Sequence, residues 1–393
     1  MARREFELPG IQDLSKEQEA ALACAGEGRH LIIGGPGTGK SVLSLLRGRR
    51  HHQEGDDYRF LVFNHLLNEA SGQLFGVGLR KATWHRWFRK TFQEITGSPA
   101  PKLAENQSGF QDIDWNEVAD LIDKLPLDLK PRQTFLVIDE GQDMPRQFYT
   151  SLVKLGFENF FVVADQNQRI TEGNSSRADI EACLDIEMND VIVLKKNFRN
   201  SYPVARLARE FDTGDPASPP PALPDRGNKS DVPRLYFYDA ERDFDIVVQG
   251  IIKRADREPH KLIGVITPNN DVRERYFDTL QSADDSNLDN PLPPIKTSYW
   301  NHRPEIAFDE GGILVINAQS CKGLEFDTAI LADIDEHERY FSHDDPDTIK
   351  RLFYVMVARA KEQVFMFMKR GRGRAIETIL PTDDNVLRRE ELR

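Results

Sequence analysis

The sequence has few cysteines and no long hydrophobic stretch. Its 393 residues include three cysteines, Cys24, Cys183 and Cys321, which are odd in number and far apart. This usage excludes a disulfide framework and a cysteine zinc site, and it fits a reducing cytosol. The longest apolar runs, such as 160–164 and 313–316, are strand-sized, whereas a membrane helix needs about 18 apolar residues or more. No secretory signal pattern opens the chain. We therefore expect a cytoplasmic protein with no membrane partner.

Positive charge is also in deficit, because 52 Lys and Arg face 64 Asp and Glu, for a net charge of −12. This balance argues against a protein that coats nucleic acid through bulk electrostatics, but it allows a local basic groove. Residues 80–90 interleave cations with aromatics, and residues 369–374 are rich in Arg. Such segments can hold single strands by stacking on bases and contacting phosphates. The alternative for 80–90 is an amphipathic helix that buries Trp84, Trp87 and Phe88 beneath a solvated basic face.

Metal ligands are sparse as well. His51 and His52 are expected on the solvated surface, because no second ligand cluster follows them at metal spacing.

The length predicts two or three domains. Short β-rich runs alternate with helical patterns, which predicts an α/β protein with repeated βα units and parallel sheets buried on both faces. The runs form two sets: 31–33, 60–63, 135–138, 160–164 and 191–194, then 235–238, 263–267, 313–317, 328–332 and 364–368. The proline-rich segment 215–224 favours an extended connection, and the boundary is expected slightly earlier, near 191–196.

One glycine-rich segment, residues 34–41, fits the pattern G-x-x-x-x-G-K-[ST] and lies between an apolar run and a helical run. Glycines let successive backbone N–H groups converge on phosphate oxygens at a helix N-terminus. Lys40 is expected to reach the β- and γ-phosphates, and the Ser41 hydroxyl to bind Mg²⁺. The segment predicts a nucleoside triphosphate site formed by Gly35, Pro36, Gly37, Thr38, Gly39, Lys40 and Ser41.

A second constellation, Asp139 and Glu140, follows the apolar run 135–138. Acidic residues at the carboxyl end of a strand beside a phosphate loop are where an α/β sheet places its metal and base. Asp139 is expected to hold Mg²⁺, mostly through water, and Glu140 to orient and deprotonate the attacking water. Taken alone, the pair would be a solvated turn.

Five segments in order, 34–41, 137–143, 197–201, 322–326 and 354–360, resemble the motifs of UvrD/Rep-like superfamily 1 DNA helicases. The resemblance covers about residues 14–368. It implies two RecA-like P-loop domains with parallel sheets and an ATP site in the cleft between them. The expected domains are 1–192, with a small helical insertion at about 86–132, and 193–393.

The resemblance also implies roles for single residues. Gln18 resembles the glutamine that reads the adenine edge, although Ser15 and Gln18 also form a capping-box pattern. Phe198 resembles the aromatic that stacks on adenine; in isolation it would be a core residue. Gln168 resembles the glutamine that senses the γ-phosphate. Arg199 and Arg359 resemble arginine fingers; in isolation either would be an ion-pairing surface residue.

Glu325 is expected near the ribose or in the nucleotide cleft. The implied catalytic set is Lys40, Asp139, Glu140, Gln168, Arg199 and Arg359, and the implied nucleic-acid contacts are Asn64, Thr83, Trp84, His85, Gln319 and Lys322.

The departures from the family pattern are informative. Residues 169–176 lack the aromatic and arginine that stack and split bases, with Gly173 and Asn174 in their places. Gln319 replaces a usual histidine and Ala358 a usual threonine. The interval 199–317 is too short to add the large regulatory insertion. These differences predict a minimal ATPase core.

The resulting hypothesis is an ATP-dependent single-stranded DNA translocase or helicase that moves 3′-to-5′ and uses ATP and Mg²⁺. One alternative is a nucleic-acid-gated ATPase subunit that controls a partner such as a nuclease and unwinds little alone. Further alternatives are an RNA helicase and an unrelated P-loop ATPase. Besides single-stranded DNA, the possible nucleic-acid substrates are a tailed duplex and RNA.

Overall fold

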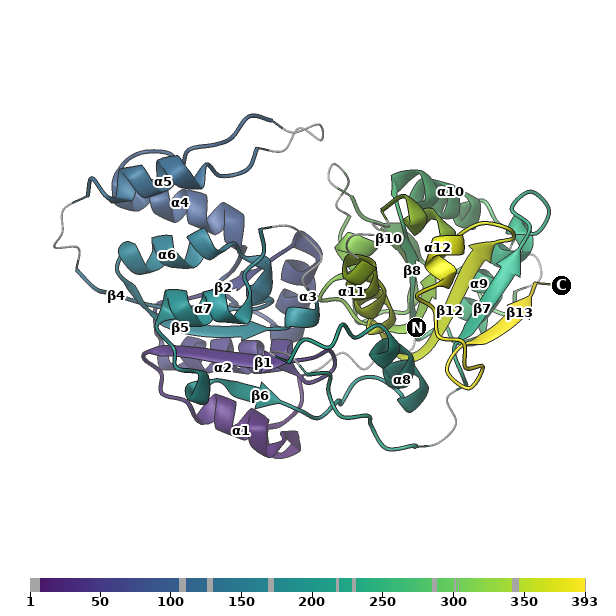
Figure 1. Ribbon diagram of the computed structural model, residues 1–393, viewed down its shortest axis with the longest axis horizontal. Coiled ribbons are helices and arrows are strands. Elements are labelled where there is room, and N and C mark those ends of the chain that lie inside the picture. Colours follow the sequence, from purple (N-terminus) through teal and green to yellow (C-terminus); the bar gives the residue numbers. More distant parts are fainter. Residues whose placement is uncertain are drawn as a thin grey trace. The chain divides into compact units, whose positions relative to one another are not determined.

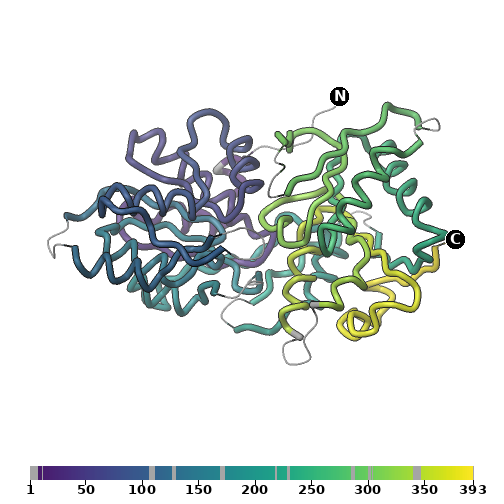
Figure 2. The backbone as a smooth tube through the Cα atoms, turned by 90° about the horizontal axis from the view of Figure 1, so that it is seen from above, coloured from purple at the N-terminus to yellow at the C-terminus, as the bar shows by residue number. Residues whose placement is uncertain are grey.

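The computed structural model describes residues 8–105, 111–125, 130–168, 173–216, 219–227, 231–284, 288–299, 302, 304–340 and 346–392. The chain forms two compact units (Figures 1 and 2). The N-terminal unit comprises Leu8–Gly34 and Gly39–Leu194, and the C-terminal unit comprises Gly35–Thr38 and the chain from Lys195 onward. Among the helices described, none is long and apolar enough to cross a membrane.

The N-terminal unit is built on a six-stranded sheet in the order β3-β2-β4-β5-β1-β6. All neighbouring strands are parallel, so their carboxyl ends share one edge. The five predicted runs of this half are confirmed as strands, and the short β3 was not predicted. The strands are β1 Arg29–Gly34, β2 Tyr58–Val62, β3 Lys81–Thr83, β4 Arg132–Ile138, β5 Phe157–Ala164 and β6 Ile192–Leu194.

Helices cover both faces of this sheet, because successive strand side chains point to opposite sides. In β1, Leu31 and Ile33 join the core under α4 to α7, whereas Ile32 joins the core under α1 to α3. Figure 1 shows α4 to α7 on one side of the sheet. The helices are α1 Lys16–Ala23, α2 Lys40–Glu54, α3 His65–Phe75, α4 Trp84–Thr96, α5 Trp115–Ile122, α6 Arg146–Lys154 and α7 Arg177–Leu184.

Helix α4 is strongly amphipathic. Trp84, Trp87 and Phe88 are buried in the core, while Arg86 and Lys90 are exposed. The Trp84 ring packs edge-on against Phe148, with ring centroids 5.3 Å apart. The structure therefore favours the amphipathic-helix alternative for residues 80–90.

The C-terminal unit has a seven-stranded parallel sheet in the order β13-β7-β12-β11-β8-β10-β9. The five predicted runs of this half are strands, whereas β9 and β13 were not predicted. The strands are β7 Arg234–Tyr238, β8 Leu262–Thr267, β9 Ile295–Thr297, β10 Gly312–Asn317, β11 Phe326–Leu331, β12 Ala360–Lys369 and β13 Arg388–Glu391. The predicted α/β class with parallel sheets is confirmed.

Five helices accompany this second sheet: α8 Tyr202–Glu210, α9 Phe244–Arg257, α10 Asn270–Gln281, α11 Pro346–Val357 and α12 Arg374–Glu377. Helices α9 and α10 pack on β7, β8 and β10 through a continuous apolar core. Short 3₁₀ helices connect elements in both units: η1 Ile11–Asp13, η2 Gly141–Asp143, η3 Gln166–Gln168, η4 Met188–Asp190, η5 Ala318–Cys321 and η6 Ile334–Tyr340. The described part of the proline-rich segment has no helix, as predicted, and Ala222 bridges to Lys196 in parallel.

A buried carboxylate, Asp333, ties the end of β11 to its neighbours. Its φ of 46° is left-handed, which is uncommon for a residue other than glycine. Its carboxylate accepts a hydrogen bond from the Tyr276 hydroxyl at 3.0 Å and lies 3.1 Å from the Lys369 ammonium. Tyr238 and Arg275 also donate to it. A buried charge needs this many partners, so the cluster fixes how α10, β7 and β12 meet β11.

One buried histidine makes the stability of the C-terminal unit pH-dependent. His337, in η6, is 1% exposed and packs edge-on against Phe353. Burial lowers the pKa of His337 from 6.5 to about 4, because the apolar surroundings disfavour the charged ring.

We expect His337 alone to contribute a loss of about 3 kcal/mol in the free energy of unfolding as the pH drops from 6.5 to 4. In that window the unfolded chain binds a proton on His337 that the folded chain excludes. Denaturant unfolding at several pH values measures this slope. His337→Phe should flatten it, whereas the same change at the exposed His52 should not. An unchanged slope in His337→Phe would show that this ring contributes nothing.

Candidate functional site

The glycine-rich segment forms the predicted turn between β1 and α2. Gly37 and Gly39 have φ values of 74° and 84°, in the left-handed region that favours glycine. A Cβ at Gly39 would collide with the Gln18 side-chain amide, and a Cβ at Gly37 with that of Asn197. Both positions therefore require glycine, and α2 begins immediately afterwards at Lys40. A strand, a glycine turn and a helix N-terminus in this order form an anion-binding arrangement.

Lys40, the first residue of α2, is buried and paired with a carboxylate. Its Nζ lies 3.4 Å from Oδ2 of Asp165, which is fully buried after the end of β5. The same oxygen accepts the Gln168 side-chain amide at 2.6 Å. Strand β5 lies directly beside β1, so parallel pairing brings these side chains together. Asp165 is the counter-ion of Lys40 in this structure and holds Gln168 as well.

Asp139 and Glu140 lie at the end of β4, on the other side of β5, and both are buried. Glu140 has a φ of 54°, and such strained positions cluster at functional sites. Burial and the neighbouring Glu140 raise the pKa of Asp139, while the Ser41 hydroxyl and the Lys40 charge oppose that rise. The sequence therefore correctly predicted that these acidic residues lie beside the glycine turn.

Gln142 joins the acidic pair to the Lys40 counter-ion. Its Nε2 donates to Oε2 of Glu140 at 2.8 Å, and its Oε1 accepts the backbone N–H of Asp165 at 2.9 Å. One hydrogen-bonded network thus runs from Glu140 through Gln142 and Asp165 to Lys40 and Gln168. Sequence analysis gave no role to Gln142 or Asp165. Both stand within three residues of a predicted site residue; Asp165 directly follows β5 and Gln142 lies in η2, shortly after β4, which was the available signal.

The donor set fits Mg²⁺. Within the described residues, Oδ2 of Asp139 is buried without a hydrogen-bond partner, and the Ser41 hydroxyl hydrogen-bonds to the same carboxylate group. Carboxylate and hydroxyl oxygens are ligands for this small hard cation, which keeps most of its positions for water and phosphate. Ser41 and Asp139 are the residues that would hold it.

Gln18 has the structural role that its spacing from Ser15 predicted. The Ser15 hydroxyl accepts the Gln18 N–H at 3.3 Å, and Oε1 of Gln18 accepts the Ser15 N–H at 2.8 Å. This capping box is confirmed. The amide end of the side chain lies against Gly39, so contact with adenine stays a prediction that the position of Gln18 beside the turn supports.

Phe198 is 45% exposed, so its interpretation as a core residue is wrong. The Lys196 ammonium lies 4.9 Å from its ring centre. The Phe198 N–H donates to the Gly37 carbonyl at 2.8 Å, which places this exposed ring next to the glycine turn. Stacking on a base stays a prediction for Phe198.

The remaining candidates lie in the C-terminal unit. Arg199 forms an ion pair with Glu325, whose second oxygen lies 3.6 Å from Lys361. Arg359 is 1% exposed, and its Nε donates to the Val355 carbonyl at 3.0 Å. Lys322 is buried and Gln319 is exposed at the end of β10. Their predicted roles stay predictions.

Of the candidate nucleic-acid contacts in the N-terminal unit, Asn64 caps α3, because its Oδ1 accepts the Leu67 N–H at 2.8 Å. Thr83 precedes α4 at its N-cap position, and Trp84 is buried. His85 is half-buried, and its pKa is lowered to about 4 by burial and then by the charge of Arg89. A role in contacting nucleic acid stays a prediction for all four residues.

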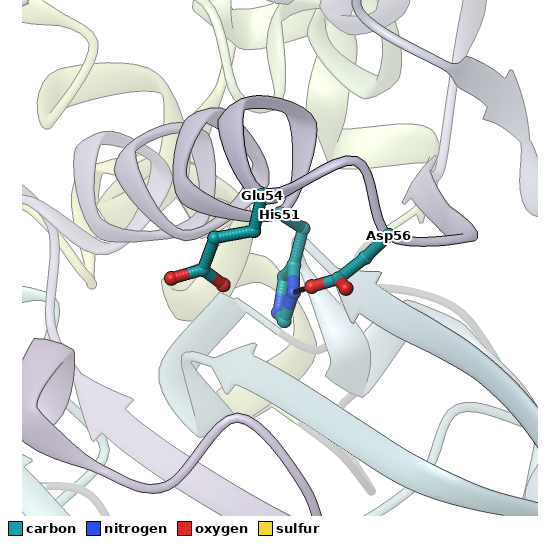
Figure 3. A group of neighbouring side chains, drawn as sticks. All are labelled: His51, Glu54 and Asp56. Atoms are coloured by element: carbon teal, nitrogen blue, oxygen red, sulfur yellow. Dashed lines mark hydrogen bonds and ion pairs between the residues drawn. The ribbon is translucent and has the colours of Figure 1, made fainter.

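His51 differs from its predicted surface position. It is 1% exposed, its ring stacks on Phe135 with centroids 4.3 Å apart, and its Nδ1 lies 2.8 Å from Asp56 Oδ2. Figure 3 shows this pair with Glu54, which extends away from Asp56. The three ligand atoms lie within 4.8 Å of one another, but Glu54 is exposed and pairs with Arg50 at 3.0 Å. His51 therefore packs α2 against β4, and the group carries no metal assignment.

Residues 312–367 match the family described as the UvrD-like helicase C-terminal domain. The predicted resemblance to UvrD-like helicases is confirmed. The matched segment runs from β10 to β12 and includes the candidate residues Gln319, Lys322, Glu325 and Arg359.

A solved structure, the C-terminal domain of a possible DNA helicase from Lactobacillus plantarum WCFS1, is similar with 16% identity and a TM-score of 0.35. The similarity covers 49% of this chain and 97% of that one, and at this score it adds no argument. A search of curated proteins found no match.

We expect Asp165→Asn to lower the free energy of unfolding of the N-terminal unit by about 3 kcal/mol, because the buried Lys40 would lose its ion pair with Asp165. Denaturant unfolding measures this loss. Phosphates can replace the lost carboxylate, so a non-hydrolysable triphosphate with Mg²⁺ should stabilise Asp165→Asn more than the wild type.

The matched control is Lys40→Met combined with Asp165→Asn, which removes both charges and should recover most of the stability. Wild-type stability of Asp165→Asn alone would contradict the proposed pairing.

Proposed function

We propose that this protein is an ATP-dependent translocase or helicase that acts on single-stranded DNA in the cytoplasm and hydrolyses ATP to ADP and phosphate. The observation that carries the proposal is the network at the carboxyl edge of the N-terminal sheet. It unites Lys40, Glu140 and Gln168 through Asp165 and Gln142, beside Asp139 and Ser41. A phosphate turn, a buried acidic pair and a polar sensor are the parts that triphosphate hydrolysis needs.

Each residue has a distinct role in the proposed reaction. The glycine turn and Lys40 bind the phosphates, with Lys40 exchanging Asp165 for the γ-phosphate. Glu140 orients the attacking water and accepts its proton, and Gln142 fixes the Glu140 carboxylate. Ser41 and Asp139 would hold Mg²⁺, which would supply positive charge to neutralise the phosphates. Gln168, which shares Asp165 with Lys40, is placed to respond to the same phosphate.

The remaining residues of the proposed reaction belong to the C-terminal unit. Arg199 and Arg359 act as arginine fingers, which typically raise such rates by about 10³–10⁵. Phe198 stacks on the adenine and Glu325 lies near the ribose. The UvrD-like segment supports DNA as the substrate, and the same resemblance is the basis for proposing 3′-to-5′ movement.

A second candidate is a nucleic-acid-gated ATPase that controls a partner such as a nuclease. One observation favours it: the described elements between Arg199 and Asn317 are α8, α9 and α10 with strands β7 to β10, and all four strands belong to the C-terminal sheet. The described chain therefore shows no large additional domain there. A reduced core of this kind can hydrolyse ATP in response to a strand without separating strands.

We expect single-stranded DNA to stimulate ATP hydrolysis more than blunt duplex or RNA does, and Glu140→Gln to reduce turnover by about 10²-fold or more with nucleotide binding retained. Phosphate release measures turnover. Strand displacement on duplexes with a 3′ or a 5′ tail separates the two candidates, because stimulation without displacement supports the gated ATPase. Turnover that no nucleic acid stimulates would contradict both.

A further inference from the structure

A basic pocket lies on the N-terminal unit, away from the glycine turn. It has a volume of about 440 Å³ and is open to solvent. Four of its eight lining side chains are Lys or Arg, in a chain whose net charge is −12. The lining residues are His85, Arg86, Arg89, Lys90, Gln93, Pro99, Ala100 and Lys102.

The sequence builds this pocket from two walls. Along α4, positions 85, 86, 89, 90 and 93 recur at one-turn spacing, opposite the buried aromatics of the same helix. Gly97, with a φ of 74°, ends α4 and turns the chain back to form the second wall at 99–102. An antiparallel bridge from Lys102 to Ile113 fixes that wall, with the Asp114 N–H donating to the Pro101 carbonyl at 3.0 Å. The pocket is therefore preformed.

Positive charge dominates its lining. Among the described residues, two acidic groups form ion pairs with the lining: Asp112, whose carboxylate lies 3.8 Å from His85, and Glu94, which lies 3.5 Å from Lys90. After burial, the charges of Arg89 and Lys102 are among the causes that lower the pKa of His85, while Asp112 opposes them. The lining thus offers four cations against two flanking carboxylates, which suits a polyanion.

The described lining of the pocket differs in composition from a single-strand site. Proteins that hold single strands combine a basic groove with aromatic rings on which unstacked bases lie. No Phe, Tyr or Trp is among the eight lining residues, and Trp84, Trp87 and Phe88 of α4 are buried beneath them. Phosphates alone are recognised by such a surface, and a duplex presents phosphates densely while keeping its bases stacked.

We propose that this pocket binds the phosphate backbone of duplex DNA, so that the protein holds the duplex part of a tailed substrate separately from the single strand. The proposal rests on the proposed function, because it names the second part of the same substrate. It assigns Arg86, Lys90 and Lys102 to the duplex, through charge and without reading sequence.

The test uses the full chain with Arg86→Glu and Lys90→Glu combined, because both side chains are exposed and lie outside the hydrolysis network. Arg89 is left unchanged, since it donates to the Gln111 carbonyl and helps to hold the wall. The matched control is Lys16→Glu with Arg50→Glu, which makes the same charge change on the exposed surface of α1 and α2, over the other face of the sheet. Fluorescence anisotropy measures binding of a blunt duplex and a single-stranded oligonucleotide at several salt concentrations.

We expect the pocket variant to lose about tenfold or more in affinity for the duplex and to reduce the salt slope by about 2, one unit for each phosphate contact removed. Affinity for the single strand should change less than about twofold, and ATP hydrolysis without nucleic acid should be unchanged. Unchanged duplex binding, an equal loss in the control, or an equal loss for the single strand would each overturn the proposal.

The experiments distinguish a failure of the pocket assignment from a failure of the proposed function. If single-stranded DNA stimulates hydrolysis but the pocket variant binds duplex normally, the pocket assignment fails and the proposed function stands. If the pocket variant loses duplex binding while no nucleic acid stimulates the wild type, the pocket stands and the proposed function fails.

Discussion

The buried ion pair between Lys40 and Asp165 is the interaction on which the candidate site depends. It exists because β5 lies between β4 and β1 in a parallel sheet, so three strand ends meet at one edge. A buried ammonium without a counter-ion would be strongly unfavourable, and Asp165 meets that need. Because the same carboxylate holds Gln168, and its backbone holds Gln142, any ligand that draws Lys40 away changes the surroundings of both glutamines. Under the proposed function, nucleotide binding and catalysis would thereby be coupled through Asp165.

Helix α4 has two roles in the N-terminal unit. Its aromatic residues form the core that supports the sheet, and its cations form one wall of the basic pocket. A single amphipathic pattern therefore supplies both stability and a charged surface. The chain as a whole is negatively charged, so most of its surface repels polyanions. The basic pocket on α4 is a local exception that attracts them.

Much of the fold follows from local sequence. All ten predicted apolar runs are strands, because parallel strands buried on both faces are continuous hydrophobic segments. The three missed strands are short: Lys81–Thr83 and Ile295–Thr297 contain a lysine and a threonine, and Arg388–Glu391 is entirely charged. They lie at the sheet edges, where pairing with a neighbour decides the structure.

For the candidate site, the sequence indicated positions but not partners. Motif spacing singled out Lys40, Asp139 and Glu140, which stand at a helix start and a strand end, and the family resemblance singled out Gln168. The structure places these side chains near one another, and their roles stay predictions. Motif spacing did not identify Asp165 as a counter-ion, since that role depends on which strands are neighbours. Burial was the least predictable property: Phe198 is exposed and His51 is buried, because tertiary contacts far along the chain decide both.

The most direct test of the central claim is a crystal structure of the full chain with a non-hydrolysable ATP analogue and Mg²⁺. The account predicts that Lys40 leaves Asp165 and contacts the γ-phosphate, that Ser41 and Asp139 face the metal, and that Glu140 stays hydrogen-bonded to Gln142. An analogue bound elsewhere, or a Lys40 that remains paired with Asp165 while the triphosphate is bound, would contradict it.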